Sequence, residues 1–275
     1  MAEIKKTGRY KTTHLPEAHV EPGSRGKVLK NLLGIKRKRE MDDLEAREQL
    51  RALRQIIAIY DEAHVFTSAD LRSIHRTWLG PIYSWAGEYR QVNVSKDDFP
   101  FAAAREIPRL MSELERGPLR QYTPCRFESD DEVVKALAIV HSELMLIHPF
   151  REGNGRVGRL LAILMGLQAK LPPLDFTDIK GKKRLEYLRA VQAGLDRDYE
   201  PMESESLTTW SVRPVGLLYE RDLAGIPGEL GWQWKSDLHA VYGSRRAHRR
   251  VKKFLPLLGV YQVRIGFDKR LTHLF

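Results

Sequence analysis

Two apolar helices joined by a very short glycine-rich loop are the feature that most limits how this chain can fold. The first helix begins at a capping box, Ser129-Asp130-Asp131-Glu132, whose acidic side chains lie at the positive end of the helix dipole. Its apolar face continues at near-helical spacing through Val133, Leu137, Val140, Leu144 and His148. Because Pro149 cannot extend the ladder, we expect the helix to end at or next to His148.

The second helix is expected to start near Arg156 and to end before Pro172-Pro173. Its buried stripe consists of Val157, Leu160, Leu161, Leu164 and Met165. The residues 148–156 therefore form a tight loop held between two core helices.

Four further helical segments are expected from the periodicity and the capping signals. Two of them span 43–60 and 182–195. The third follows the capping box Thr67-Ser68-Ala69-Asp70 and stops at Gly80-Pro81, and the fourth spans 102–115 and ends near Gly117-Pro118. A short helical turn is expected over 28–34. Residues 90–101 alternate instead, with Lys96-Asp97-Asp98 as the turn, which predicts a small β-hairpin with Pro100 on an edge. A strand is expected within 254–265. We predict three parts: an irregular extension over 1–42, a helical domain over 43–205 and a C-terminal extension over 206–275.

The composition is that of a soluble globular protein, with 42% hydrophobic and 30% charged residues among 275. No apolar run approaches the ~18 residues that a membrane helix needs, and no apolar stretch follows the N-terminal charges as in a signal peptide. The single Cys125 excludes an internal disulfide and a cysteine-rich metal site, so we expect a cytoplasmic setting.

The net charge of +10 is concentrated in two runs, residues 25–39 and 245–253. Such runs are more often solvated faces or tails than binding sites, so the charge alone is weak support for nucleic-acid binding. The run at 245–253 leaves open a partner site, a secretion address for an effector delivered to another cell, or a solvated tail.

The loop itself presents groups that suit a polyphosphate. Gly153-Asn154-Gly155 lets successive N–H groups point at one spot, and the following helix adds its own unpaired N–H groups there. Arg156 and Arg159 lie three residues apart and can reach one face together. Glu152 can bind Mg²⁺ between phosphate oxygens, and His148 can accept a proton from a hydroxyl group. There is no Gly-x-x-x-x-Gly-Lys-Ser/Thr, which disfavours a P-loop enzyme.

The segment His148-x-Phe150-x-Glu152-Gly153-Asn154-Gly155-Arg156-x-x-Arg159 resembles the full signature of the Fic (filamentation induced by cAMP) domain family. The resemblance extends over about 45–205, including Ser84-Trp85-Ala86-Gly87-Glu88-Tyr89-Arg90 and Tyr199-Glu200-Pro201, and 28–35 resembles the family's N-terminal lead-in. It implies an all-α, Fic-type helical bundle with a β-hairpin flap. It also implies a protein adenylyltransferase that transfers AMP from Mg-ATP to a Ser, Thr or Tyr hydroxyl of a target protein.

The resemblance assigns roles residue by residue. His148 would be the catalytic base and Glu152 the magnesium ligand. The nucleotide would be bound by Gly153, Asn154, Gly155, Arg156, Arg159 and, at the adenine, Tyr187, although an aromatic residue at helical spacing is more often part of the core. The flap, with Val92, Val94, Phe99 and Phe101, would receive the target segment as an added strand.

The inhibitory pattern of many Fic proteins, Ser/Thr-x-x-x-Glu-Gly/Asn, is not completed here. Thr13-x-x-x-Glu17 is followed by Ala18, and Ser84-x-x-x-Glu88 by Tyr89. A separate small antitoxin-like protein is the simplest source of inhibition, and Glu17 acting despite Ala18 is the second hypothesis. The competing functions are another Fic-fold transfer (phosphorylation, UMP or phosphocholine transfer) and a non-catalytic basic module that binds nucleic acid or protein.

Overall fold

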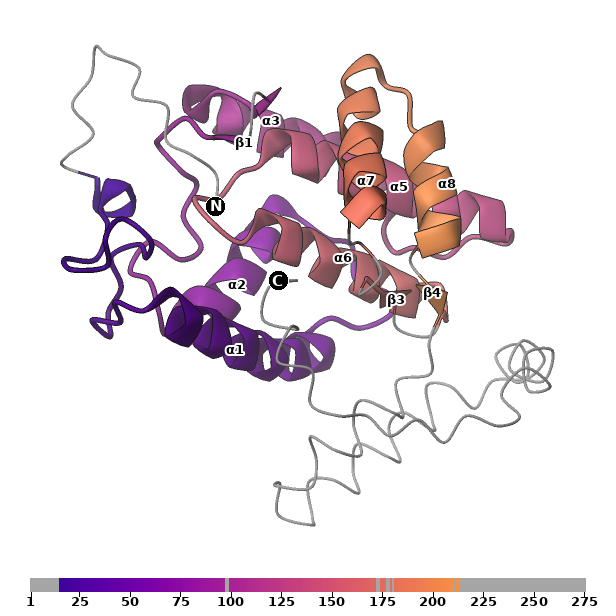
Figure 1. The fold of residues 1–275 in the computed structure, drawn as a ribbon. Helices are drawn as coiled ribbons and strands as arrows, with labels where there is room; N and C mark the ends of the chain where they lie inside the picture. The colour runs from indigo at the N-terminus through magenta and orange to yellow at the C-terminus, as the bar shows by residue number, and fades with distance from the viewer. Residues whose placement is uncertain are drawn as a thin grey trace, which may run out of the picture.

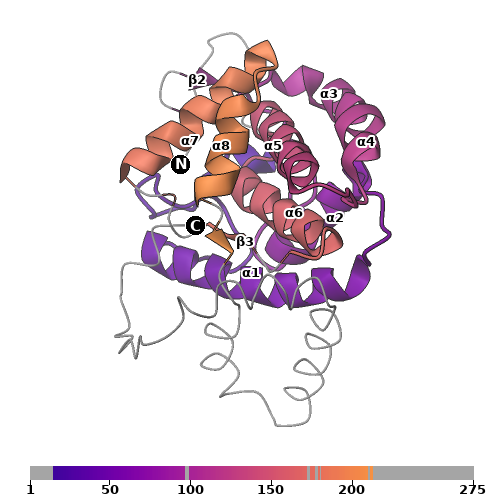
Figure 2. The same cartoon turned by 90° about the vertical axis from the view of Figure 1, so that its right-hand side faces the viewer.

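Helix α5 forms the centre of the molecule. In the computed structural model, which describes residues 15–96, 99–171, 174–176, 179, 181–209 and 211–212, α5 spans Asp130–Ile147. It is buried on nearly all sides because α6 (Asn154–Gln168), α3 (Ile107–Leu114), α7 (Gly181–Ala193) and α8 (Glu200–Thr209) pack around it. Helix α2 (Ser68–Leu79) contacts α6 and α1 (Lys38–Ile59), and α1 crosses below the bundle (Figures 1 and 2). The predicted all-α fold is confirmed.

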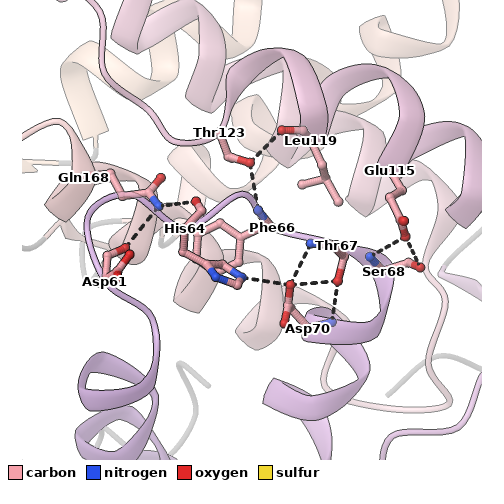
Figure 3. Close-up of polar contacts among 10 residues, drawn as sticks. All are labelled: Asp61, His64, Phe66, Thr67, Ser68, Asp70, Glu115, Leu119, Thr123 and Gln168. Carbon is pink, nitrogen blue, oxygen red and sulfur yellow. Dashed lines mark hydrogen bonds and ion pairs between the residues drawn. The ribbon is translucent and has the colours of Figure 1, made fainter.

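Both predicted capping boxes are present. Thr67 accepts the Asp70 N–H and Ser129 accepts that of Glu132, and each acidic side chain accepts the N–H of its N-cap residue. The beginning of α2 is also held by distant segments (Figure 3). Glu115 accepts the Ser68 N–H at 2.9 Å, and Thr123 Oγ1 accepts the Phe66 N–H at 2.9 Å. These contacts fix α2, which carries part of the candidate site described below.

The N-terminal residues 15–37 are irregular, as predicted, but the short helical turn expected over 28–34 is wrong. Val20 pairs with Leu29 in an isolated antiparallel bridge. The Asn31 side chain accepts the Leu33 and Ile35 N–H groups and donates to the Ile35 carbonyl. These local bonds satisfy the backbone in place of a helix.

The hairpin is present and short. Strand β1 (Ser95–Lys96) pairs antiparallel with β2 (Phe99–Pro100), in the register Ser95↔Pro100 and Lys96↔Phe99. Val92 and Val94 precede the strands and are buried against Leu15. The expected turn residues Asp97 and Asp98 lie outside the described residues.

The helix expected over 102–115 differs at both ends. A 3-10 turn, Ala104–Glu106, precedes α3, and the chain stays helical past Gly117 through a π turn (Glu115–Leu119) and α4 (Arg120–Tyr122). The expected stop near Gly117-Pro118 is therefore wrong. The wider π turn accommodates Pro118, which has no N–H to donate, and buried Leu119 anchors the segment.

The remaining boundaries shift by a few residues. Helix α1 begins at Lys38, so it crosses the predicted division at 42/43, which stays a prediction along with the other domain boundaries. A 3-10 turn, Gly194–Asp196, ends α7. Helix α8 was not expected. The two-stranded pairing of β3 (Leu174–Asp175) with β4 (Ser211–Val212) was not expected either, because strands of two residues carry no readable period. The expected strand within 254–265 and the basic run 245–253 lie outside the described residues. Among the described helices, none has the length and apolar character needed to span a membrane.

Candidate functional site

The loop between α5 and α6 is closed on itself by Asn154. Its side-chain oxygen accepts the Phe150 N–H at 2.8 Å and its amide donates to the Phe150 carbonyl at 2.8 Å. Gly153 has a φ of 85°, and a Cβ added there would lie 2.6 Å from the Trp78 ring. The loop is thus packed directly on α2 through the Trp78 ring. Both polar atoms of the Asn154 side chain are therefore used inside the loop.

His148 ends α5 in the left-handed conformation, with φ 52° and its N–H bonded to the Leu144 carbonyl. Its Nδ1 lies 3.3 Å from the Met145 carbonyl oxygen. A carbonyl only accepts, so this contact favours the tautomer with hydrogen on Nδ1, and no bond from the described residues occupies Nε2. Burial lowers the pKa of His148 to about 3, which keeps the imidazole neutral at pH 7. The Phe101 ring stacks on it, with centroids 3.6 Å apart.

Arg90 ties the histidine to the base of the flap. The side chain is almost fully buried, and its guanidinium donates to the carbonyls of His148 at 2.7 Å, Val92 at 2.8 Å and Ala102 at 2.6 Å. The Arg90 N–H donates to the Pro149 carbonyl at 2.9 Å. The cation therefore lies at the negative C-terminal end of α5, and it fixes both ends of the hairpin relative to His148.

His75, from α2, supports the other side of the loop. Its Nε2 contacts the Glu152 carbonyl at 3.0 Å while its Nδ1 accepts the Gly87 N–H at 2.7 Å. The ring stacks on Phe150 with centroids 4.0 Å apart. Burial lowers the pKa of His75 to about 4, so the ring is a neutral structural link in which each nitrogen has a partner.

Two arginines extend from the beginning of α6. The Arg156 N–H donates to the Gly153 carbonyl at 3.0 Å, but among the described residues the Asn154 and Gly155 N–H groups have no acceptor, and the N-cap Gly153 offers no side chain to satisfy them. Arg159 is half-buried beside Gly155: a Cβ added at Gly155 would lie 3.5 Å from the Arg159 Nη1. Within the part of the chain that the structure describes, no carboxylate pairs with Arg159. The end of α6 thus combines unpaired donors with an uncompensated cation, which is an anion site.

Among the described side chains, the positive charge of Arg156, unlike that of Arg159, lies next to carboxylates. Its Nη1 lies 2.7 Å from Glu45 Oε2 of α1, its Nη2 lies 3.7 Å from Glu152 Oε1, and its guanidinium stacks 4.3 Å from the centre of the Trp78 ring. Burial favours the neutral form of Glu152, but Arg156, the Gly153 N–H and Arg151 outweigh it and lower its pKa. Glu152 is therefore an ionised, partly exposed carboxylate at the mouth of the loop.

The N-terminal segment contacts this region through Glu17. The Glu17 carboxylate accepts the Gln91 and Val92 N–H groups at 2.6 and 3.1 Å, and its carbonyl accepts from Arg151 Nε at 3.1 Å. In many Fic proteins the inhibitory glutamate pairs with the second arginine of the motif, which here is Arg159. The hypothesis that Glu17 acts in this way is wrong for this structure, because its carboxylate is bound at the base of the flap.

The residues expected at the site from the sequence do not all lie together. His148, Glu152, Gly153, Asn154, Gly155, Arg156 and Arg159 lie together on the loop and the first turns of α6, and Phe101 covers His148. Tyr187 of α7 is buried, and its hydroxyl bonds with His141 Nε2 at 2.8 Å. Burial raises the pKa of Tyr187 to about 12, and the nearby Arg159 charge opposes that rise. Val92 and Val94 are buried, so neither side chain lies at the surface of the hairpin.

Three residues that support the site were missed from the sequence: Glu45, His75 and Arg90. Glu45 gave a signal, since it lies on the same stripe of α1 as buried Met41, Ala52 and Ile56, where a carboxylate needs a partner. Nothing local to Arg90 or His75 indicates which carbonyls they bind.

Comparison with known proteins agrees with this geometry. Residues 65–165 match the model of the Fic/DOC family. A probable protein adenylyltransferase, y4lH of Sinorhizobium fredii, is 28% identical over 201 residues, covering 72% of this chain and 96% of that protein. A probable protein adenylyltransferase Fic of Escherichia coli is 31% identical over 150 residues, covering 51% of this chain and 70% of that protein. Of the protein adenylyltransferase VbhT of Bartonella schoenbuchensis, which is 30% identical over 156 residues (55% of this chain), the chain spans only 30%.

Solved structures share the fold. The BepC protein of Bartonella tribocorum, with bound AMPPNP, superposes with a TM-score of 0.57 at 22% identity, covering 73% of this chain and 99% of that one. The N-terminal Fic domain of a putative cell filamentation protein of Bartonella quintana, with bound ADP, gives 0.54 at 27% identity, covering 69% and 94%.

Proposed function

This chain belongs to the Fic/DOC family and is an enzyme of the transferase class, and from that premise we propose that it transfers AMP from Mg-ATP to a Ser, Thr or Tyr hydroxyl of a target protein. Relatives named protein adenylyltransferases support the AMP group, and the Fic domain with bound ADP supports an adenine nucleotide as the substrate.

The observation that carries the proposal is the state of His148 beside the anion site. A neutral imidazole whose Nδ1 is turned to the Met145 carbonyl leaves Nε2 to accept a proton, and the backbone of the same loop leads directly into the beginning of α6. In the proposed reaction the target oxygen attacks the α-phosphorus and gives its proton to His148 Nε2. The bond from the α-phosphorus to the bridging oxygen breaks, and pyrophosphate leaves. The products are an AMP ester of the hydroxyl and pyrophosphate.

The phosphates would lie at the end of α6. The N–H groups of Asn154 and Gly155 would surround them, next to Gly153, whose own N–H donates to Glu152 Oε1 at 3.1 Å. Arg156 would lie beside the phosphates and Arg159 at the γ-phosphate end. Gly155 leaves room for that approach, since its α-carbon faces only the Arg159 guanidinium. We also propose that Tyr187 lies by the adenine, supported by the proximity of Arg159 that shifts its pKa.

A magnesium ion fits the donors present. Glu152 is ionised, partly exposed and next to the proposed phosphates, and Mg²⁺ prefers one or two carboxylates together with phosphate and water oxygens. Among the described residues, no three or more His, Cys, Asp or Glu side chains gather in a way that could hold a metal ion without other ligands. When bound, the ion would neutralise charge on the phosphates, and Glu152 would hold it there.

The target segment would add to the hairpin as a further strand. The β1–β2 pair leaves strand edges open among the described residues, Val92 and Val94 anchor its base, and Phe101 lies on the catalytic ring. Phe99, in edge contact with Phe101, would contact the target beside the hydroxyl. We further propose that a separate small antitoxin controls the enzyme in the cytoplasm, since neither candidate inhibitory glutamate completes its pattern.

Labelled ATP separates the candidate functions. Native protein and His148→Ala are incubated with a cell lysate and ATP labelled at the α or the γ position, or with α-labelled UTP. AMP transfer is supported if label from ATP labelled at the α position stays on protein with the native enzyme but not with His148→Ala. Retention of the γ-label supports phosphorylation, and retention from UTP supports UMP transfer. No protein label from either nucleotide, together with salt-dependent DNA binding, supports the non-catalytic module.

A further inference from the structure

Glu45 makes the closest charged contact of Arg156, yet it comes from α1, outside the loop. Its Oε2 lies 2.7 Å from Arg156 Nη1, its Oε1 accepts the Tyr83 hydroxyl at 2.7 Å, and its backbone carbonyl accepts Trp78 Nε1 at 2.9 Å. The side chains of Glu45 and Arg156 are 4% and 7% exposed, so the pair is desolvated. Trp78 in turn covers the flat face of the guanidinium.

This arrangement fixes how Arg156 is oriented relative to Glu152. One edge of the guanidinium is held by Glu45, and the other lies 3.7 Å from Glu152 Oε1, too far for a hydrogen bond. Arginine normally forms two parallel hydrogen bonds with a carboxylate. Here the preferred partner is Glu45, and the contact with Glu152 is the longer of the two.

The unequal distances have an electrostatic consequence at Glu152. If Glu45 were neutral, the Arg156 charge would have Glu152 as its nearest carboxylate, and the two would be drawn together. Arg156 would then occupy the oxygens that a cation needs, and the uncompensated positive charge would repel a divalent ion. The same charge would attract the phosphates of a metal-free nucleotide more strongly.

We propose that Glu45 is a positioning residue that holds Arg156 away from Glu152 and thereby keeps the Glu152 carboxylate available to a divalent cation. The inference rests on the proposed function, because it takes the nucleotide and its metal as the ligands of this loop. It adds to that function a residue of α1 that sets how strongly metal and nucleotide depend on each other.

The test measures the coupling between ADP and Mg²⁺ by calorimetry or by thermal shift, with no catalytic turnover. The dissociation constant of ADP is determined with and without Mg²⁺ for native protein, Glu45→Gln and Tyr83→Phe. The dissociation constant without Mg²⁺ divided by that with Mg²⁺ is the coupling ratio. Glu45→Gln is expected to lower the ratio at least about fivefold, within the usual range of coupling effects, with metal-free ADP binding unchanged or tighter. Tyr83→Phe, which keeps both charges and removes one hydrogen bond from Glu45, should lower the ratio less.

Two controls separate positioning from loss of structure. Glu115→Gln changes a carboxylate that also joins separate elements, through Ser68, and should leave the ratio unchanged. In an Arg156→Gln background, Glu45→Gln should have no further effect on the ratio, because the group through which Glu45 acts is absent.

The outcomes distinguish the two proposals. If native protein binds ADP with no effect of Mg²⁺, or binds no ADP, the nucleotide site itself is wrong and the inference falls with it. If native protein shows the coupling and folded Glu45→Gln shows the same ratio, the positioning role alone is overturned. Should Glu45→Gln fail to fold, the Tyr83→Phe result decides, and an unchanged ratio there overturns the role.

Discussion

Arg90 donates to the carbonyl oxygen of His148 at 2.7 Å, and the same guanidinium reaches Val92 and Ala102 on the two sides of the hairpin. The proposed catalytic base and the proposed docking strand are therefore held by one buried cation. Its position at the end of α5 also satisfies carbonyls that have no partner within the helix.

Arg90→Gln is expected to lower kcat on the order of 100-fold, since a small displacement of His148 or the flap misplaces the reacting groups. Stability should fall by more than about 2 kcal/mol, because several buried carbonyls lose their donor. Turnover is measured with labelled ATP below the unfolding transition, and stability by urea denaturation. Arg109→Gln, at an exposed arginine paired with Glu106 and Glu113, is the control and should change neither quantity. Equal turnover in both variants would show that Arg90 does not position the base.

Gly153→Ala and Gly155→Ala should act in different ways. At Gly153, the φ of 85° and the Trp78 ring 2.6 Å from a new Cβ predict a loss of roughly 1–3 kcal/mol of stability. At Gly155, the nearest atom is 3.5 Å away and the backbone is helical, so stability should be kept or raised by up to about 1 kcal/mol. ADP binding should nevertheless weaken in Gly155→Ala, because the methyl group blocks close approach of a phosphate. Thermal unfolding with and without ADP measures both effects, and unimpaired ADP binding in Gly155→Ala would contradict the phosphate site.

Phe101→Ala should move the acidic limb of the kcat/KM profile to higher pH. Burial is the main cause of the low pKa of His148, and the stacked ring excludes water from one face of the imidazole. Without that ring the pKa rises from about 3 toward the ordinary value of about 6.5, so the base becomes protonated at a higher pH. The pH profile is compared with that of Phe99→Ala, whose ring contacts Phe101, and NMR titration of the imidazole gives the pKa directly. Identical limbs in the two variants would rule out this role of Phe101.

The buried histidines should make the fold sensitive to acid. Burial lowers the pKa of His75 and of His141 to about 4, below the value of about 6.5 expected in the unfolded chain. Between these values the unfolded chain binds more protons, so stability rises with pH and is lost as the pH falls from about 6.5 to 4. Each such histidine contributes a slope of about 1.4 kcal/mol per pH unit. Urea unfolding at several pH values checks this, and His141→Asn should remove one proton from the dependence; a slope unaltered by that change would contradict the assignment.

Glu17→Ala is expected to leave auto-AMPylation unchanged or lower. The carboxylate binds two N–H groups at the base of the flap, so its loss leaves those donors unsatisfied at about 1–3 kcal/mol each and loosens the docking strand. Incorporation of label from ATP labelled at the α-phosphate measures the activity. Glu21→Ala, in the same segment and bonded to Asn31, controls for general loosening of the N-terminal residues. A rise in labelling specific to Glu17→Ala would restore the inhibitory hypothesis.

Local sequence signals were enough to predict the central helices, their caps and the composition of the loop. Ser129 with Glu132, Thr67 with Asp70, and Pro149 after His148 act within a few residues of chain, so their effects can be read locally. The groups around the proposed phosphates are nearly consecutive, which is why one segment was enough to suggest the family.

Which distant groups support that loop depends on how the helices and the hairpin pack together. Three contacts join residues that are far apart in the chain: the ion pair of Glu45 with Arg156, the hydrogen bond from Arg90 to His148, and the stacking of Phe101 on the imidazole. A buried charge needs a partner. The position of a charged residue within the apolar periodicity of a helix predicts that it is buried, but it does not predict which group it contacts. That choice depends on how α1 and the hairpin pack against the two central helices.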